Sequence, residues 1–221
     1  MLGESMNEHE LAARLNALFS GLPGDCGNET RPGTDESPGN RDWSQRSTTR
    51  DQARIERVLE GMLTPFSRIL HIGIGNSSLA SRFCGQERAI CGLTISQAEL
   101  AHARSLQLPG YDAKLINKYG REFMALAGDF DFIIDNNPTT FACCNRHFAR
   151  MMLACRARLA QDGLMLTDKT GLAHLASDDP QLGRWSFSET DWKMVAQTIA
   201  MTTRAHGEHV LALGHKTNMA A

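Results

Sequence analysis

Two glycines between a strand-like run and a helix-like run are the first candidates for chemistry in this 221-residue chain. The apolar run 68–72 leads into Gly73 and Gly75, and helical spacing of apolar residues resumes shortly afterwards. Glycines at such a turn let a ligand approach the backbone closely. A dinucleotide fingerprint would need a third glycine where Ser78 stands and an acid where Thr94 stands. The loop therefore predicts a ligand site and disfavours a nicotinamide dinucleotide.

A second group of polar residues ends an apolar run further along the chain. Asp135, Asn136 and Asn137 come at the end of the run 131–135 and directly before Pro138. A carboxylate and two amides at this point could orient or deprotonate an acceptor. An Asp-Asn turn that caps the next helix is the competing interpretation.

Two more side chains are candidates for proton transfer or substrate binding. His147 lies six residues after Phe141 on the same predicted helix, and an imidazole can take a proton from a hydroxyl or amine near neutral pH. A structural histidine is the alternative. Lys169 follows Asp168 at the end of another apolar run, and we expect it to bind substrate or to belong to a solvated ion pair.

The cysteines show no spacing that identifies a metal site or a disulfide framework. The sequence contains no C-x-x-C pair, although two of the cysteines are adjacent. The six positions are Cys26, Cys84, Cys91, Cys143, Cys144 and Cys155. We therefore expect buried thiols and no metal.

The periodicity of apolar residues indicates the elements that position these side chains. Short apolar runs predict strands at 68–72, 89–94, 113–116, 131–135, 164–168 and 209–216. Helical spacing alternates with them at 77–84, 96–106, 121–127, 141–160 and 188–201. Alternating strands and helices predict an α/β protein with a doubly wound, mostly parallel sheet. Ligands bind at the carboxyl ends of the strands in such sheets.

The first 41 residues differ in composition from the rest of the chain. A helix with an apolar stripe is predicted at 8–19, and the following stretch to residue 41 is rich in Gly, Pro and polar residues, typical of a flexible linker. The main domain is expected to span 42–221 and to open with a helix that ends near residue 62. Trp43 lies in otherwise polar sequence just before this helix, and we expect it to be buried as part of a lid over the ligand site.

Charge and hydropathy exclude several classes of partner. The net charge is −2 and no Lys/Arg-rich run occurs, so nucleic acid is not an expected partner. No apolar run approaches the roughly 20 residues that span a membrane. The first residues carry Glu4, Glu8 and Glu10 and no basic segment, unlike a signal peptide. A cytoplasmic protein is the expectation.

Four segments, in this order, resemble motifs of the class I S-adenosylmethionine-dependent methyltransferases of the small-molecule type. They are ILHIGIGNSSL, CGLTIS, DFDFIID and RARLAQDGLMLTDK. The resemblance covers about residues 42 to 215 and implies a Rossmann-like, seven-stranded sheet with an N-terminal helical extension. It implies S-adenosylmethionine as the cofactor. The cofactor-binding residues that it implies are Gly73, Gly75, Asn76, Thr94, Ile95, Gln97, Asn117, Asp135 and Asn136.

The resemblance also implies a reaction, which is methyl transfer to a small-molecule substrate. Asp135, Asn136 and His147 would then orient or deprotonate the acceptor, whose reacting atom (N, O or C) stays open. Trp43, Asn137 and Lys169 would contact substrate or form the lid. The N-terminal helix and the Trp43 segment must close the pocket, or a second copy of the chain in a homodimer must do so.

Two positions depart from the pattern that the chain resembles. His71 and Thr94 stand where this family usually has acids, and both acids help to hold the cofactor. A non-catalytic, methyltransferase-like binding module is therefore the alternative from another functional class. A nicotinamide-dependent oxidoreductase is a third hypothesis, against which Thr94 and the absent third glycine both argue.

Overall fold

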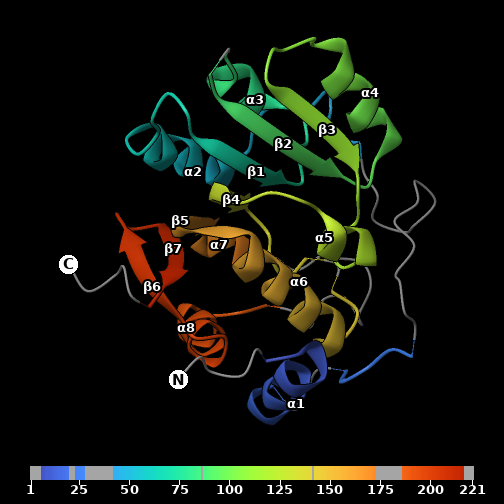
Figure 1. The fold of residues 1–221 in the computed structure, drawn as a ribbon, viewed down its shortest axis with the longest axis vertical. Helices are drawn as coiled ribbons and strands as arrows, with labels where there is room; N and C mark the ends of the chain where they lie inside the picture. Colours follow the sequence, from blue (N-terminus) through green and yellow to red (C-terminus); the bar gives the residue numbers. More distant parts are fainter. Residues whose placement is uncertain are drawn as a thin grey trace.

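One seven-stranded sheet forms the centre of the molecule (Figure 1). The structure is a computed structural model that describes residues 6–19, 23–27, 42–85, 87–140, 142–172 and 186–216. Its strands are β1 Arg68–Ile72, β2 Ala89–Thr94, β3 Tyr111–Leu115, β4 Phe130–Asp135, β5 Leu159–Asp168, β6 Met201–His206 and β7 Val210–His215. Their order in the sheet is β3-β2-β1-β4-β5-β7-β6. The expected doubly wound, mostly parallel sheet is confirmed.

Strand direction determines where a ligand can bind. β1 pairs in parallel with β2 on one side and with β4 on the other, whereas β7 runs antiparallel to both β5 and β6. The strand order reverses between β1 and β4, and the loops that leave these two strands diverge to opposite faces of the sheet. This divergence opens a crevice at their carboxyl ends, which is where open α/β sheets bind ligands.

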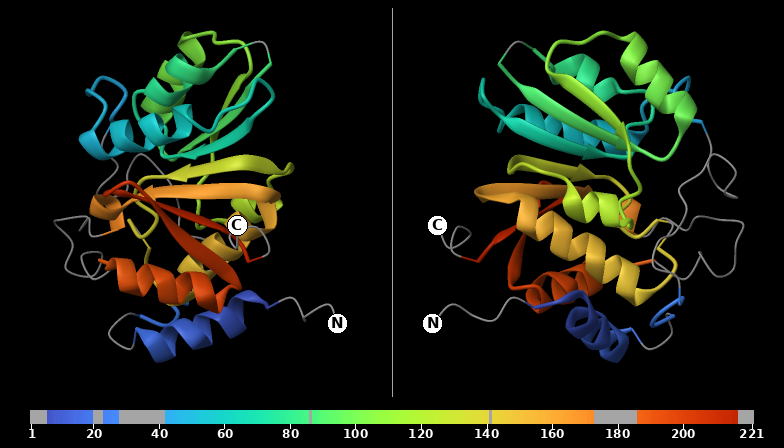
Figure 2. Two further views of the ribbon diagram at one scale, coloured as in Figure 1. Left: turned by 90° about the vertical axis from the view of Figure 1, so that its left-hand side faces the viewer. Right: turned by 45° about the vertical axis from the view of Figure 1, so that its right-hand side comes forward.

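Helices cover both faces of the sheet (Figure 2). On one face lie α2 Arg50–Glu60, α3 Ser78–Phe83 and α4 Gln97–Ser105; on the other lie α5 Arg121–Ala125, α6 Asn145–Arg158 and α8 Glu189–Thr198. The short helix α7 Lys169–Leu172 follows β5 directly. Because successive side chains of a strand point to opposite faces, a strand covered on both faces needs apolar residues on each. In β1, Ile69 packs toward α2, whereas Leu70 and Ile72 pack toward α6.

The N-terminal helix α1 Glu8–Leu18 forms an additional layer outside α6 and α8 (Figure 2). Asn7 and Glu10 form a capping box that starts it, and Leu11 and Leu15 are fully buried in the same apolar core as α6. The predicted helix thus belongs to the packed core of the main domain. Most of the predicted linker, residues 20–22 and 28–41, lies outside the described residues.

The last predicted helix is shorter than expected and is followed by a strand that was not predicted. The helix expected at 188–201 ends at Thr198. Two residues later, Ala200 adopts a positive φ of 56°, which is incompatible with a continuing α-helix. β6 then pairs antiparallel with β7 across a turn at Gly207. Its backbone hydrogen bonds to β7, from residues later in the sequence, decide the conformation of residues 201–206.

The predicted helix at 141–160 is shorter in the structure at both ends. α6 begins at Asn145, capped by Cys144, and β5 begins at Leu159, five residues before the expected start at 164. Of the extra residues, Leu159 pairs with Phe130, and the register then shifts so that Phe132 pairs with Leu164. In the described part of the chain, no helix is long and apolar enough to cross a membrane.

Candidate functional site

A cavity of about 300 Å³ opens at the carboxyl ends of β1, β2, β3 and β4. Its walls are the glycine loop 73–77, the ends of β2 and β4, the loop after β3, and the segment 43–52 that leads into α2. The cavity therefore occupies the crevice that the reversal of strand order creates. The predicted ligand site and the largest group of predicted site residues come together here.

The glycine loop has a backbone conformation that side chains disfavour. Gly73 and Gly75 have φ values of 77° and 49°, in the left-handed region. A side chain on Gly75 would begin 3.6 Å from the Cβ atom of Trp43, at the wall of the cavity. The amide of Gly73 donates to the carbonyl of Leu93 at 2.8 Å, which fastens the loop to β2. Glycine at position 75 therefore keeps the space between the loop and Trp43 open.

Residues 42–49, which we call the flap, fold over the glycine loop. The Asn76 amide donates to the Arg46 carbonyl at 2.8 Å and to the Thr48 hydroxyl at 3.2 Å. The guanidinium of Arg46 lies 4.4 Å from the ring centre of Trp43. The expected burial of Trp43 is wrong, because the residue is 37 % exposed at the surface of the flap. The position of Trp43 over the cavity is what the lid hypothesis requires, and its role as a lid stays a prediction.

A buried carboxylate, that of Glu99, lies beside Thr94 at the end of β2. Glu99 Oε2 accepts a 2.6 Å hydrogen bond from the hydroxyl of Thr94, and Oε1 accepts one of 3.2 Å from the amide of Trp43. Burial raises the pKa of this carboxyl, and the Thr94 and Trp43 donors oppose the rise. A carboxylate thus lines the cavity beside Thr94, supplied by the first turn of α4 instead of by β2.

Sequence reasoning missed Glu99 because its spacing suggests another role. Ser96 and Glu99 have the S-x-x-E spacing of a capping box, and the Ser96 hydroxyl does accept the amide of Glu99 at 3.3 Å. In a complete box the glutamate would turn back to the amide of Ser96. That amide donates instead to Thr94 Oγ1 at 3.0 Å, and the Glu99 carboxylate faces the cavity.

His71 is a buried, neutral base on the floor of the cavity. It is 2 % exposed, and its Nδ1 atom has no hydrogen-bond partner among the residues that the structure describes. Burial lowers the pKa of the imidazole to about 4. At neutral pH His71 therefore offers a lone pair and no charge at the position where a carboxylate was expected from the resemblance.

This depressed pKa predicts a loss of stability in mild acid. Between about pH 6.5 and pH 4 the unfolded chain protonates this histidine and the folded protein does not, so folding is disfavoured as the pH falls. A shift from 6.5 to about 4 corresponds to about 3 kcal/mol of unfolding free energy. Urea unfolding at about pH 7 and pH 4 should show this loss, and the His71→Gln variant should lack it. Equal pH dependence in both proteins would contradict the assignment.

Asp135, at the end of β4, forms a buried ion pair with Lys118. The Lys118 ammonium lies 2.9 and 3.2 Å from the two carboxylate oxygens, and it donates to the carbonyl of Asn137 at 2.7 Å. The Asp135 and Lys118 side chains are 3 % and 12 % exposed. Asp135 lines the cavity, as predicted, but its carboxylate is engaged by Lys118, so in this arrangement it orders the loop after β4.

The two asparagines that follow Asp135 present acceptor atoms. The side-chain nitrogen of Asn136 donates a hydrogen bond of 2.6 Å to the carboxylate of Asp51. The side-chain oxygen of Asn136 takes no part in this bond. The side-chain oxygens of Asn136 and Asn137 are both buried and have no hydrogen-bond donor within the described ranges. A buried acceptor without a hydrogen-bond donor lowers the stability of the folded protein. Both residues line the cavity, next to Asp135.

The structure brings most predicted site residues together at the cavity and places three elsewhere. The predicted residues that line it are Trp43, Gly73, Gly75, Asn76, Thr94, Ile95, Asn117, Asp135, Asn136 and Asn137. Gln97, His147 and Lys169 do not line it. Lys169 pairs with Glu189 at 2.8 Å, and the neighbouring Asp168 is held by Arg54.

His147 is the largest departure from the predicted site. α6 begins two residues before it, and the first turn of this helix directs the imidazole toward Cys143 and Cys144. The ring is fully buried there. The expected role of His147 as a base in the cavity is therefore not supported, because helical spacing alone does not tell which side of a helix faces a ligand.

Comparison with known proteins identifies the fold. A scan of family profiles finds no match, and a search of curated proteins finds none either. Solved structures do match. A methyltransferase from Bacteroides fragilis in complex with S-adenosylhomocysteine is 15 % identical with a TM-score of 0.56, covering 78 % of both chains. The sugar N-methyltransferase KedS8 from Streptoalloteichus is 12 % identical with a TM-score of 0.54, covering 77 % of this chain and 88 % of that one.

A third match extends over almost the whole chain. The N-methyltransferase NodS from Bradyrhizobium japonicum, in complex with S-adenosylhomocysteine, is 13 % identical with a TM-score of 0.51. It covers 94 % of this chain, and the alignment includes 97 % of NodS. The chain therefore has the Rossmann-like fold of the S-adenosylmethionine-dependent methyltransferases, as the sequence motifs implied.

Proposed function

We propose that this protein is a methyltransferase that takes its methyl group from S-adenosylmethionine and transfers it to a small molecule. The carrying observation is the cavity at the strand-order reversal, where the glycine loop, the buried carboxylate of Glu99 and the buried imidazole of His71 line one space. Structures of this fold are known with S-adenosylhomocysteine bound. Methyl transfer is favoured over a nicotinamide reaction because the third glycine of the dinucleotide fingerprint is absent.

The residues at the cavity fit the parts of this cofactor. The Glu99 carboxylate can accept hydrogen bonds from two ribose hydroxyls. It would thereby do what an acid at the position of Thr94 does in the family that the chain resembles. The imidazole of His71, which lines the cavity, can accept from the ammonium of the methionine moiety. The open backbone at Gly73 and Gly75 allows close approach of the same moiety.

When bound, the cofactor would supply an electrophilic methyl group on a sulfonium, which is already a good leaving group. The protein then has mainly to align the acceptor and exclude water, a proximity effect that can contribute several kcal/mol. We assign the exclusion of water to the flap with Trp43. We assign acceptor orientation to Asn136 and Asn137, which line the cavity and whose amide groups can hydrogen-bond to an amine or a hydroxyl.

Calorimetric titration with S-adenosylhomocysteine tests the proposal. We expect affinity on the order of micromolar for the wild type and a 10- to 100-fold loss in Glu99→Gln, about 1.5–3 kcal/mol for hydrogen bonds to a charged group. Glu87→Gln is the matched control, since Glu87 is exposed and lies just before the amino-terminal end of β2, whereas the cavity is at the carboxyl end of this strand. Its affinity should equal that of the wild type. Because Glu99 must be ionised, affinity should also fall as the pH falls through its raised pKa.

The outcomes separate the rival functions. Tight binding of nicotinamide dinucleotide, with no binding of S-adenosylhomocysteine, would replace this proposal by an oxidoreductase. No binding of either at millimolar concentration would contradict any cofactor role for the cavity. Binding of S-adenosylhomocysteine, without its formation from S-adenosylmethionine in the presence of any of a panel of small amines and alcohols, would favour a non-catalytic binding module.

A further inference from the structure

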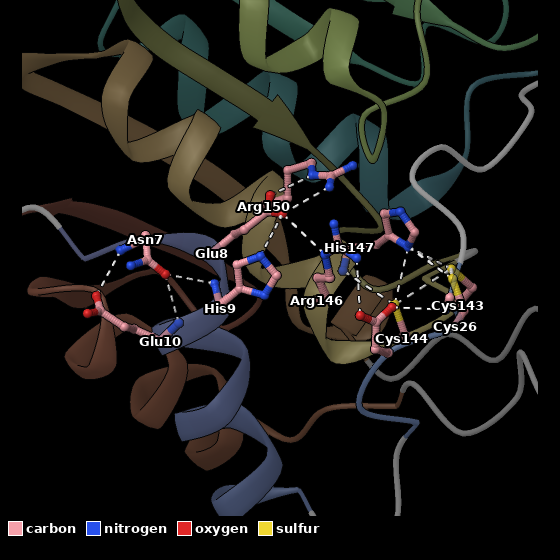
Figure 3. Close-up of polar contacts among 12 residues, drawn as sticks. Asn7, Glu8, His9, Glu10, Cys26, Cys143, Cys144, Arg146, His147 and Arg150 are labelled. Atoms are coloured by element: carbon pink, nitrogen blue, oxygen red, sulfur yellow. Dashed lines mark hydrogen bonds and ion pairs between the residues drawn. The ribbon is translucent and has the colours of Figure 1, made fainter.

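Three cysteines and one histidine meet outside the cavity, in a group that we call the thiol cluster (Figure 3). Its members are Cys26, Cys143, Cys144 and His147, and their sulfur and nitrogen atoms all lie within 4.8 Å of one another. The Nδ1 atom of His147 is 3.1 Å from the sulfur of Cys143, 3.2 Å from that of Cys144 and 3.5 Å from that of Cys26. The sulfur of Cys143 lies 3.5 Å from that of Cys26 and 4.0 Å from that of Cys144.

Hydrogen bonds among these four groups do not explain the arrangement. A neutral imidazole nitrogen has one lone pair or one hydrogen, so Nδ1 can form one good hydrogen bond. Here three sulfur atoms converge on it at 3.1 to 3.5 Å. All six cysteines of the chain are thiols, so no disulfide accounts for the contact between Cys26 and Cys143 either. A positive centre that all four atoms share would account for their convergence.

The distances match those of a tetrahedral zinc site. Zinc–sulfur bonds of about 2.3 Å and zinc–nitrogen bonds of about 2.0–2.1 Å place tetrahedral ligand atoms roughly 3.5–3.8 Å apart. The five separations given above range from 3.1 to 4.0 Å and bracket this value. Soft thiolate ligands together with one imidazole are also the donor set that zinc favours over magnesium or calcium.

The polypeptide presents these ligands from two places far apart in the sequence. Cys144 caps α6 and His147 follows in the first turn, so a helix start sets their relative positions. Cys26 comes from the segment 23–27, which is held against α6 because the amides of Asn145 and Arg146 donate to the carbonyls of Pro23 and Gly24, at 2.7 and 3.1 Å. These backbone bonds place Cys26 at the cluster independently of any metal.

We propose that the thiol cluster binds one zinc ion as a structural Cys₃His site. The three thiols lose their protons to solvent, the sulfurs bond to Zn²⁺, and the neutral His147 binds it through Nδ1. Four protein ligands complete a tetrahedron and leave no position for substrate, which is typical of structural sites. The ion would fasten the N-terminal segment to the start of α6. Cys144 and His147 are buried, whereas Cys26 and Cys143 are partly exposed, so a metal can enter from their side.

This site is independent of the proposed methyl transfer, and its test uses the full chain and metal alone. After incubation with zinc and removal of excess, elemental analysis of the wild type should find about one zinc per chain. In Cys26→Ser and Cys143→Ser the zinc content should fall roughly tenfold or more, since each loses one of four ligands. Cys84→Ser is the matched control, because Cys84 is also partly exposed but lies at the end of α3. It should retain the metal.

Cobalt substitution gives a second readout that does not depend on whether a variant folds. The wild type loaded with Co²⁺ should show thiolate-to-cobalt charge transfer and the intense visible bands of tetrahedral cobalt. Zinc absent from the wild type, or a cobalt spectrum without thiolate bands, would overturn the proposal. So would metal that stays bound in both Cys26→Ser and Cys143→Ser, or a Cys26–Cys143 disulfide in the freshly purified, metal-free protein.

Discussion

Replacing Gly75 with arginine is expected to weaken binding of S-adenosylhomocysteine by at least about 100-fold, which is about 2.7 kcal/mol or more. The Cβ of the new side chain would lie 3.6 Å from the Cβ of Trp43, so the guanidinium would fill the space between the glycine loop and the flap. The positive φ of 49° adds backbone strain of roughly 1–2 kcal/mol. Calorimetric titration measures the loss of affinity, and thermal unfolding measures the strain.

Gly207→Arg is the control for this prediction. Gly207 has a φ of 67° in the turn between β6 and β7, and a Cβ there would meet no atom within 4 Å among the described residues. The variant should therefore share the strain and the added charge of Gly75→Arg while binding S-adenosylhomocysteine as the wild type does. Comparable affinities in both variants would show that the space beside Gly75 does not hold the ligand.

Replacing Asp135 with alanine is expected to lower the free energy of unfolding by about 3–5 kcal/mol, the usual effect of removing one partner of a buried ion pair. Lys118 would keep its charge in a site where its side chain is 12 % exposed. Because Lys118 also holds the carbonyl of Asn137, the loop after β4 should lose order, and ligand binding should weaken as well. Urea unfolding followed by circular dichroism gives the stability change.

Two variants check that the effect comes from an unpaired buried charge. The double variant Asp135→Leu with Lys118→Met removes both charges and should regain most of the lost stability. Asp112→Ala breaks a Lys–Asp pair on β3 whose side chains are 40 % and 68 % exposed, and it should cost less than about 1 kcal/mol. Equal losses in Asp135→Ala and Asp112→Ala would mean that burial of the Asp135–Lys118 pair has little effect.

Local patterns were sufficient to predict most of the sheet. The short apolar run 68–72 predicted β1 to the residue, because a strand between two layers of helices needs apolar side chains on both faces: Leu70 and Ile72 face one layer and Ile69 the other. Residues 201–206 have no such pattern of their own. They form a strand because β7 supplies hydrogen-bond partners, and a partner that comes later in the chain leaves no mark on the local sequence.

The candidate site divides in the same way. By itself, the sequence determined the glycine loop and the polar residues after β4, because both follow directly from where strands end. Tertiary structure alone decided which side chains join them. Glu99 has the spacing of a helix cap but faces the cavity, and His147 has the chemistry of a base but faces three sulfurs. Helical spacing fixes which residues share a side of a helix, whereas only packing decides what that side contacts.

The thiol cluster is the clearest case of a feature that tertiary structure decided. The local sequence showed adjacent cysteines three and four residues before a histidine, without C-x-x-C spacing. The third sulfur, on Cys26, is 117 residues from Cys143 and reaches it because backbone bonds hold the segment 23–27 against the start of α6. The four donor atoms of such a site must be close together in space, and the order of residues in the sequence does not show which distant residues the fold brings together.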